Sequence, residues 1–273
     1  MELEGKIALV TGAGGGGPGG MGKGIALCFA REGADVAVND INKELAESTA
    51  AEIRAMGRRA MAVIADVSKE AEVNQMVERI IKEWGGIDIL VNNVGHGLPI
   101  LVEDMTAEEW HEVLARNLDA PFFCAKAVIP TMKSRGGGKI ITIASMAGKK
   151  ITAMTGASYT AGKAGVLGLT RQLAWELGPY HINVNAICPA GVVSSYRPTP
   201  PEQLEAMAQR IPIRRVTMSE DIAEVALFLA SERSRTITGI SIDVEGGTSL
   251  AIGDWESYIK VRKEFVAKRK QPR

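Results

Sequence analysis

The chain has 273 residues, with 32 basic and 32 acidic side chains. That length suits one α/β domain with a large core. The balanced charge and the 5% aromatic content favour no nucleic-acid partner. No segment reaches the roughly 18 uncharged apolar residues of a membrane span, so we expect no membrane partner.

Cysteine usage indicates a reducing compartment. Cys28, Cys124 and Cys188 are widely separated and lie in apolar stretches, which is typical of buried structural thiols. Their spacing suggests neither a disulfide framework nor a metal site. The N-terminal residues lack the apolar run of a secretory signal. We therefore expect a cytoplasmic protein without a metal centre.

Short runs rich in Val and Ile alternate along the chain with longer amphipathic segments. The runs are continuous rather than alternating, which is typical of strands buried on both faces. They are Lys6–Val10, Asp35–Val38, Arg59–Ile64, Ile87–Val91, Lys139–Ala144, Ile182–Ile187 and Ile240–Val244. Helical patterns between them include Lys43–Met56, Glu70–Trp84, Ala107–Lys133 and Gly156–Leu177. This alternation predicts a Rossmann-like α/β fold, a doubly wound parallel sheet of seven strands in a single domain.

A glycine-rich turn follows the first predicted strand and leads into a helix at Lys23–Arg31. Glycines let the backbone approach a pyrophosphate, and the helix N-terminus supplies unpaired N–H groups. A glycine motif alone is a weak signal, but this one has the required strand before it and helix after it. The predicted cofactor contacts in the turn are Gly12, Gly20, Met21 and Gly22.

Asp40 ends the second predicted strand, 18 residues after Gly22. An acidic side chain there accepts hydrogen bonds from ribose hydroxyls and repels a 2′-phosphate, so it selects NAD over NADP. The same residue also suits the N-cap of the following helix. Lys23 and Arg31 are basic neighbours that would weaken the preference. We expect NAD as the cofactor, with NADP as the less favoured alternative.

Tyr159 and Lys163 are one helical turn apart, so they share a helix face. A lysine ammonium beside a tyrosine favours the tyrosinate form. Tyr159 then serves as a general base for alcohol oxidation or a general acid for ketone reduction. Ser145 ends the fifth predicted strand, where its hydroxyl can hydrogen-bond the reacting oxygen. These residues predict hydride transfer between a nicotinamide and a secondary alcohol or ketone.

In their order along the chain, these motifs resemble the short-chain dehydrogenase/reductase family over roughly residues 5 to 248. The matching residues are Thr11-Gly12 with Gly20-Met21-Gly22, Asp66-Val67, Asn92-Asn93-Val94-Gly95, Asn117, Ser145, Tyr159 with Lys163, and Pro189. The resemblance implies the same fold and reaction. It also suggests a homotetramer, with the helices Ala107–Lys133 and Gly156–Leu177 at the interface.

The resemblance assigns further roles one residue at a time. Lys163 would also hold the nicotinamide ribose, and Asn117 would carry a water that relays protons. Asp66 and Val67 would contact adenine, and a cofactor channel would be lined by Asn93, Gly95 and Pro189.

Three departures from the family pattern stand out. The glycine turn carries four additional residues. Ser145 and Tyr159 are 14 residues apart, one more than is common in the family. Ala190 separates Pro189 from Gly191, which are usually adjacent. The first would reshape the pyrophosphate cradle. The second would shift Ser145, and the third puts the backbone contact of Pro189 with nicotinamide in doubt.

Substrate contacts are the least specific prediction. His96 directly follows Asn92–Gly95 at the ligand-binding edge of strand four, whereas His111 and His181 are expected to be structural. Apolar pocket candidates are Met146, Met154, Tyr196 and Met207. The long segment Gly191–Thr217 after strand six is expected to be a lid.

We expect residues 1–250 to form the dinucleotide-binding and catalytic domain, and residues 251–273 to form a basic helical tail. The tail is either a solvated helix or a segment that borders a neighbouring subunit's pocket. Two alternative functions stay open. One is an NADPH-dependent 3-oxoacyl thioester reductase, and the other is a catalytically idle partner subunit of the same fold.

Overall fold

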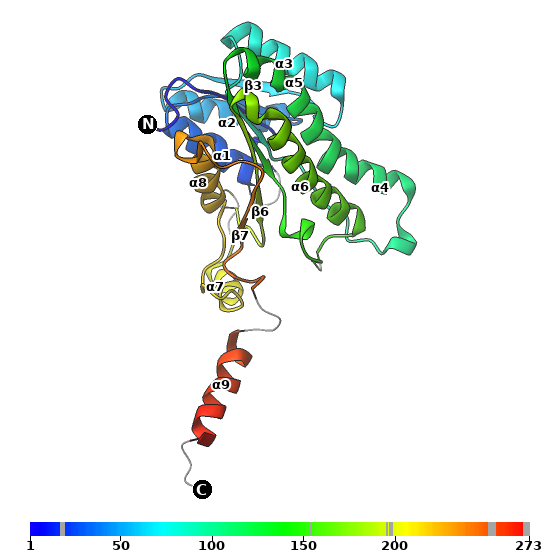
Figure 1. The fold of residues 1–273 in the computed structure, drawn as a ribbon, viewed down its shortest axis with the longest axis vertical. Helices are drawn as coiled ribbons and strands as arrows, with labels where there is room; N and C mark the ends of the chain where they lie inside the picture. The colour runs from blue at the N-terminus through cyan, green and yellow to red at the C-terminus, as the bar shows by residue number, and fades with distance from the viewer. Residues whose placement is uncertain (17–19, 153, 195, 197–198, 251–254, 270–273) are drawn as a thin grey trace.

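The computed structural model confirms a single parallel sheet of seven strands in the order β3-β2-β1-β4-β5-β6-β7, covered by helices on both faces (Figure 1). It describes residues 1–16, 20–152, 154–194, 196, 199–250 and 255–269. The strands are β1 Ile7–Val10, β2 Asp35–Asp40, β3 Ala60–Ile64, β4 Ile89–Asn92, β5 Gly138–Ile143, β6 Ile182–Pro189 and β7 Ser241–Val244. β1 pairs with both β2 and β4, so the chain reverses its direction of travel across the sheet between these strands.

The helices follow the strands as a doubly wound fold requires. They are α1 Met21–Arg31, α2 Lys43–Ala55, α3 Glu70–Trp84, α4 Ala107–Leu114, α5 Ala120–Ser134, α6 Ala157–Leu177, α7 Pro201–Gln209, α8 Ser219–Ala230 and α9 Trp255–Arg269. The helix expected over residues 107–133 is interrupted by a π-helical turn, Ala115–Asp119. Within the described residues, no helix is long and apolar enough to cross a membrane.

Two cores lie on opposite faces of the sheet because successive strand residues point to opposite sides. Ala8 and Val10 of β1 face one core, which α1, α2 and α8 cover. Ile7 and Leu9 of the same strand face the other, which α3, α5 and α6 cover. Both faces of the central strands are therefore buried, which explains why these strands are continuous apolar runs in the sequence.

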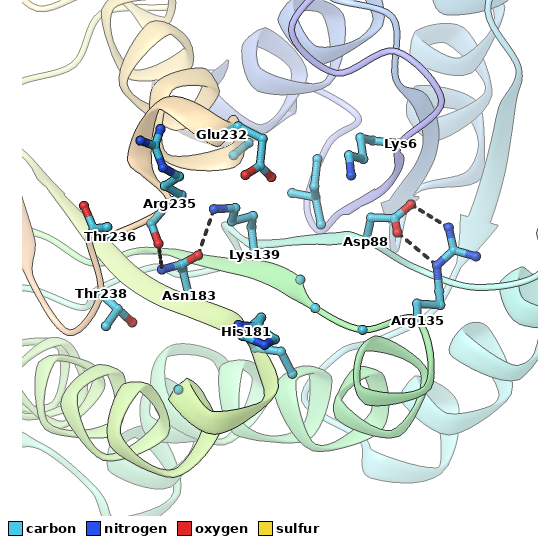
Figure 2. Close-up of a pocket in the computed structure, with 17 residues that line it drawn as sticks. Lys6, Asp88, Arg135, Lys139, His181, Asn183, Glu232, Arg235, Thr236 and Thr238 are labelled. Atoms are coloured by element: carbon cyan, nitrogen blue, oxygen red, sulfur yellow. Dashed lines mark hydrogen bonds and ion pairs between the residues drawn. The ribbon is translucent and has the colours of Figure 1, made fainter.

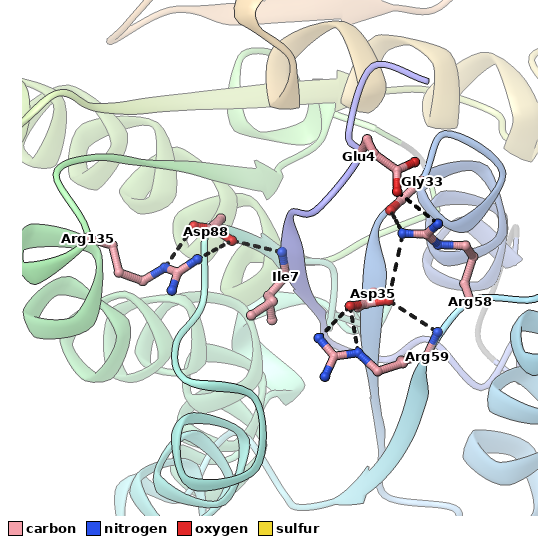
Figure 3. A network of polar contacts seen from close by, with 8 residues as sticks. All are labelled: Glu4, Ile7, Gly33, Asp35, Arg58, Arg59, Asp88 and Arg135. Atoms are coloured by element: carbon pink, nitrogen blue, oxygen red, sulfur yellow. Dashed lines mark hydrogen bonds and ion pairs between the residues drawn. The ribbon is translucent and has the colours of Figure 1, made fainter.

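Aspartates tie down the amino ends of the strands (Figure 3). The Asp35 carboxylate at the start of β2 accepts hydrogen bonds from the Arg59 backbone N–H at 3.2 Å and from its Nε at 2.8 Å. Arg58 pairs with Glu4 at 3.1 Å and also donates to the Gly33 carbonyl. These contacts fix β2, the entry to β3 and the N-terminal segment at one edge of the sheet.

Asp88 makes the corresponding link in the centre of that edge. Its Oδ2 accepts hydrogen bonds from the Ile7 backbone N–H at 2.9 Å and from Arg135 Nη2 at 3.1 Å. Its Oδ1 accepts from Arg135 Nε at 2.9 Å. One carboxylate thereby joins the start of β1, the entry to β4 and the end of α5.

We expect Asp88→Ala to lower the free energy of unfolding by about 1–3 kcal/mol, because it leaves a backbone N–H and a guanidinium without their acceptor. Urea denaturation measures this loss. Glu83→Ala is the control, since Glu83 forms a half-exposed ion pair with Arg79 on α3 and such pairs contribute about 0–1 kcal/mol. Equal losses in the two variants would contradict the assignment.

Candidate active site

The glycine turn brings the N-terminus of α1 against the end of β1. Gly12 and Gly20 have φ values of 60° and 58°, which favour glycine. A Cβ on Gly22 would lie 2.4 Å from the Gly12 carbonyl oxygen and 2.5 Å from Asn93 Nδ2. No side chain fits there, so the backbone of α1 and the backbone of the turn are in direct contact.

Asn93 joins this turn to the end of β4. Its backbone N–H donates to Thr11 Oγ1 at 2.9 Å, and its Nδ2 donates to the carbonyl oxygens of Thr11 at 3.0 Å and Gly12 at 3.2 Å. Asn93 therefore holds together the two strand ends between which ligands bind in doubly wound sheets. The sequence analysis predicted Asn93 only as a cofactor contact.

Asp40 is held in a defined orientation at the end of β2. Its Oδ2 accepts from the Gly14 backbone N–H at 2.9 Å, and its Oδ1 accepts from the Asn42 backbone N–H at 3.0 Å. The N-cap of α2 is Asn42, whose side chain accepts from Leu45 N at 2.9 Å. The suggestion that Asp40 itself caps α2 is therefore wrong, because the N-cap lies two residues later and the helix begins at Lys43.

Lys23 is already paired. Its Nζ lies 2.7 Å from Glu52 Oε1 and 4.9 Å from the centroid of the Tyr196 ring. Arg31 is the last residue of α1, at the opposite end of the helix from the glycine turn. Neither of the two basic neighbours is thus a free cation beside Asp40.

Tyr159 and Lys163 lie on the first two turns of α6. Lys163 is 3% exposed, its Nζ donates to the Ile143 carbonyl at 2.8 Å and lies 5.6 Å from the Tyr159 ring centroid. Burial lowers the pKa of Lys163 to about 8. Burial also raises the pKa of Tyr159, opposed by a hydrogen bond with the Ser145 side chain. The expected lowering of the Tyr159 pKa by the Lys163 ammonium is therefore not found.

Asn117 occupies the π-helical turn between α4 and α5. Its Nδ2 donates to the carbonyl oxygens of His96 at 2.7 Å and Val113 at 2.8 Å, while its Oδ1 is buried without a partner. A Cβ on Gly95 would lie 2.5 Å from that Oδ1 and 2.9 Å from Lys163 Nζ. Both polar groups therefore lie too close to Gly95 for any side chain at that position.

A cavity of about 740 Å³ connects the glycine turn with Tyr159. Predicted site residues that line it are Gly12, Gly20, Met21, Gly22, Asp40, Asp66, Val67, Asn93, Gly95, His96, Met154 and Tyr159. Seven others are not among its lining residues: Asn117, Ser145, Met146, Lys163, Pro189, Tyr196 and Met207. Of these, Asn117, Ser145 and Lys163 approach the cavity through their contacts with Gly95 and Tyr159.

Three of the proposed pocket residues lie elsewhere. Met146 is buried in a small core that includes Ala144 and Val166. A Cβ on Gly20 would lie 2.9 Å from the Tyr196 ring, so Tyr196 covers the glycine turn. Met207 belongs to α7, which has no buried residue.

Several cavity residues were missed by the sequence analysis, notably Arg116 and Thr155. Arg116 Nη2 pairs with Glu112 Oε1 at 3.0 Å, and His96 Nε2 lies 3.9 Å from the same oxygen. Burial and the Arg116 charge lower the pKa of His96, against the pull of Glu112. The only sequence signal for Arg116 was its position directly before Asn117.

A second cavity, of about 540 Å³, lies at the amino edge of the sheet (Figure 2). It contains none of the predicted catalytic residues. Lys139 there donates to Asn183 Oδ1 at 2.8 Å, and Arg135 is held by Asp88. Among the described residues, no group of three His, Cys, Asp or Glu side chains is arranged to hold a metal ion.

The region expected to be a lid is described except at residues 195, 197 and 198, so Pro198 lies outside the described residues. Val193 forms a parallel bridge with Met218, which ties the start of the region to the start of α8. Ser194 Oγ would lie 2.5 Å from a Cβ on Gly20. The segment thus begins over the glycine turn, and its movement stays a prediction.

We expect Gly22→Ala to lower the melting temperature and weaken dinucleotide binding, because the new methyl group would force the Gly12 carbonyl away. Thermal denaturation and NADH fluorescence titration measure the two effects. Gly168→Ala on α6 is the matched control, since its Cβ would meet only Arg171 Nη2, at 4.0 Å, and alanine stabilises a helix by about 0.5–1 kcal/mol relative to glycine. Unimpaired dinucleotide binding by Gly22→Ala would contradict the role of this close contact.

Comparison with known proteins agrees with this geometry. Residues 16–249 match a family model described as enoyl-(acyl carrier protein) reductase. An uncharacterized oxidoreductase of Thermotoga maritima is 38% identical over 91% of this chain and 99% of its own. A 3-oxoacyl-[acyl-carrier-protein] reductase of Staphylococcus epidermidis is 40% identical over 89% of this chain and 98% of its own.

Solved structures agree as well. A short-chain dehydrogenase/reductase from Burkholderia xenovorans has a TM-score of 0.85 at 37% identity, covering 92% of this chain and 99% of its own. A 7α-hydroxysteroid dehydrogenase solved with NADH and 7-oxo glycochenodeoxycholic acid has a TM-score of 0.82 at 37% identity, covering 90% of this chain and 95% of its own. With its sheet order, glycine turn and Ser145–Tyr159–Lys163 group, the chain belongs to the short-chain dehydrogenase/reductase family of oxidoreductases.

Proposed function

We propose that this chain is an NAD(H)-dependent oxidoreductase that transfers a hydride between nicotinamide and a secondary alcohol or ketone. The observation that supports this most directly is that Tyr159 lines the same cavity as the glycine turn and Asp40. When bound, the nicotinamide supplies the hydride donor or acceptor. The chain supplies binding, orientation and the proton.

The residues present fit a dinucleotide. Glycine at positions 12, 20 and 22 lets backbone N–H groups reach a pyrophosphate at the N-terminus of α1. The Asp40 carboxylate, oriented by the N–H groups of Gly14 and Asn42, is placed to accept hydrogen bonds from ribose hydroxyls and to repel a 2′-phosphate. Because Glu52 pairs with Lys23, that lysine does not counteract the repulsion. These contacts support NAD over NADP.

Proton transfer is assigned to Tyr159. Burial keeps its hydroxyl protonated, which suits a general acid that protonates the carbonyl oxygen during reduction. Ser145 hydrogen-bonds the same hydroxyl and orients the substrate oxygen. In alcohol oxidation, Tyr159 acts in the reverse direction, as the tyrosinate that accepts the proton.

Asn117 is proposed to hold the water that carries the proton onward. A buried acceptor without a partner costs about 1–3 kcal/mol, and Asn117 Oδ1 is such an acceptor. This oxygen and Lys163 Nζ both lie close to Gly95, which has no side chain. A water there would accept a hydrogen bond from the ammonium and donate one to the amide oxygen.

The runner-up is an NADPH-dependent 3-oxoacyl thioester reductase, which the relative from Staphylococcus epidermidis favours. The contacts of Asp40 and Lys23 argue against NADPH as the cofactor. A catalytically idle partner subunit is disfavoured because Asn117, Ser145, Tyr159 and Lys163 are all in place. For the substrate, His96 and the exposed Met154 at the cavity support a partly apolar alcohol or ketone.

A homotetramer and a cytoplasmic location stay predictions. The exposed Phe122 on α5 and Trp175 on α6 lie on the helices expected to form the subunit interface, which supports association through these faces. The absence of a nucleic-acid partner and a domain boundary near residue 250 likewise stay predictions.

We expect Tyr159→Phe to lower turnover by roughly 10²–10⁴, the usual contribution of general acid–base catalysis, while NADH binding persists. The assay follows NADH absorbance in a screen of secondary alcohols and β-hydroxyacyl thioesters. Tyr180→Phe is the matched control, because Tyr180 lies beyond the other end of α6. Turnover near that of the wild type in Tyr159→Phe would overturn the assignment.

We expect Asp40→Ala to reduce the ratio of kcat/KM with NAD to kcat/KM with NADP by roughly 10- to 100-fold, mainly by weakening NAD. Hydrogen bonds to a charged group contribute about 1.5–3 kcal/mol, and this range sets the expected factor. Glu44→Ala, which removes an exposed carboxylate from the first turn of α2, is the control. A wild-type enzyme that already prefers NADPH would show that Asp40 does not decide the cofactor.

A further inference from the structure

The second cavity, of about 540 Å³, lies at the amino ends of the strands, at the edge of the sheet opposite the glycine turn and Tyr159. Its volume falls within the range of about 300–1,000 Å³ that is typical of small-molecule sites. Its charged lining residues are basic in excess, with a net charge of +2 when His181 is neutral. They are Lys6, Arg135, Lys139 and Arg235, against Asp88 and Glu232. The cavity therefore suits a small anion.

One ammonium that lines this cavity is buried. Lys139 on β5 is 8% exposed, and its Nζ donates to Asn183 Oδ1 at 2.8 Å. That acceptor is a neutral amide, and no carboxylate of the described residues forms an ion pair with Lys139. Burial lowers the pKa of Lys139, while the Glu232 carboxylate opposes this shift and the Lys6 ammonium adds to it. Because buried charges in proteins are normally paired, this ammonium lacks a counter-ion.

The position of this ammonium is fixed by Asn183. The Asn183 Nδ2 donates to the carbonyl oxygens of Arg235 at 3.2 Å and Ile237 at 3.1 Å. Since both amide hydrogens are used there, the amide oxygen faces Lys139. The bond to the Arg235 carbonyl also holds the backbone that carries Arg235 and Thr236 against the same wall of the cavity (Figure 2). The ammonium is thus oriented before any ligand binds, which lowers the cost of binding.

The other charges of the cavity determine which anion fits it. Arg135 is neutralised by Asp88, so its charge is not available. Lys6 and Arg235 are exposed, and within the described part of the chain neither forms an ion pair. Figure 2 shows the Glu232 carboxylate between Lys6 and Lys139, so one negative charge opposes three positive ones. The excess of two positive charges matches a phosphate monoester, which carries about −1.5 to −2 at pH 7.

We infer that the cavity at the amino edge of the sheet binds a phosphate group, either as the free ion or as part of a small phosphate monoester. The Lys139 ammonium donates to a phosphate oxygen, and Lys6 and Arg235 at the exposed rim balance the remaining charge. Glu232 opposes binding by repulsion. No residue of the candidate active site lines this cavity, so phosphate binding here is independent of the proposed function.

Isothermal titration calorimetry with inorganic phosphate, in chloride buffer at constant ionic strength, tests the site without any activity measurement. We expect saturable binding that Lys139→Met weakens by roughly 10-fold or more, because it removes a charge-assisted hydrogen bond. Lys82→Met, at an exposed position in the last turn of α3, is the control with the same change in net charge. Absence of binding to the wild type, or equal affinities in the two variants, overturns the inference.

Glu232 provides a second test with the opposite sign. Glu232→Gln removes the carboxylate that repels the anion, so we expect it to bind phosphate several-fold more tightly than the wild type. Glu232 is exposed, and its substitution leaves the core intact. Glu83→Gln on α3, which removes a carboxylate far from the cavity lining, should leave the affinity unchanged. Weaker or unchanged binding in Glu232→Gln would show that no anion occupies the cavity.

Inorganic phosphate also suits the helix N-terminus at the glycine turn, so Gly22→Ala is titrated in parallel. Binding that is lost in Gly22→Ala but retained in Lys139→Met would place the ion at the glycine turn and overturn the inference. Glycerol 3-phosphate then distinguishes the two sources of the phosphate group. Tighter binding than that of inorganic phosphate, again lost in Lys139→Met, supports a monoester as the ligand, whereas weaker binding supports the free ion.

Discussion

A buried ammonium at the end of β5 is the constraint on which the catalytic group depends. Lys163 Nζ donates to the Ile143 carbonyl, and this contact fixes the first turns of α6, and with them Tyr159, relative to the sheet. Because burial depresses its pKa to about 8, the charged form destabilises the folded chain at every pH below about 8. That cost is relieved as pH rises from 8 towards the unfolded value of 10.5. A group that lowers stability at neutral pH is typical of a functional site rather than a structural one.

The same contact explains two other features of the site. Gly95 has no side chain because Lys163 Nζ and Asn117 Oδ1 occupy the space where a Cβ would be. Asn117 reaches that space because its helix widens into a π-helical turn, and such turns are frequent at functional sites. The end of β5, Gly95 and the π-helical turn thus each adapt the structure to the buried Lys163 ammonium.

Most of the fold could be predicted from the sequence because its strands are buried on both faces. Strands such as Ile89–Asn92 must be apolar throughout, so they stand out from the amphipathic helices. The crossover rules predicted a parallel sheet, and the family motifs located Tyr159 and Lys163. What could not be predicted depends on contacts between distant segments. The burial of Met146 and the place of Tyr196 over Gly20 have no local pattern.

The direction of the shift in the Tyr159 pKa shows that proximity in the sequence is not sufficient to predict a pKa. One helical turn between Tyr159 and Lys163 suggested a lowered tyrosine pKa, but the ammonium is turned towards the Ile143 carbonyl. Desolvation then dominates and raises the pKa. The sequence indicates which groups share a helix face, whereas the balance between burial and charge depends on where each polar atom finds its partner.

The glycine turn and Asp40 are joined by a backbone contact. The Gly14 N–H donates to the Asp40 carboxylate, and a Cβ on Gly14 would lie 2.7 Å from the same oxygen. Together with the hydrogen bond from the Asn42 N–H, this contact uses one acceptor position on each carboxylate oxygen within the protein itself. In the proposed function, the remaining lone pairs carry the discrimination between NAD and NADP, so the orientation of Asp40, and not only its charge, contributes to that choice.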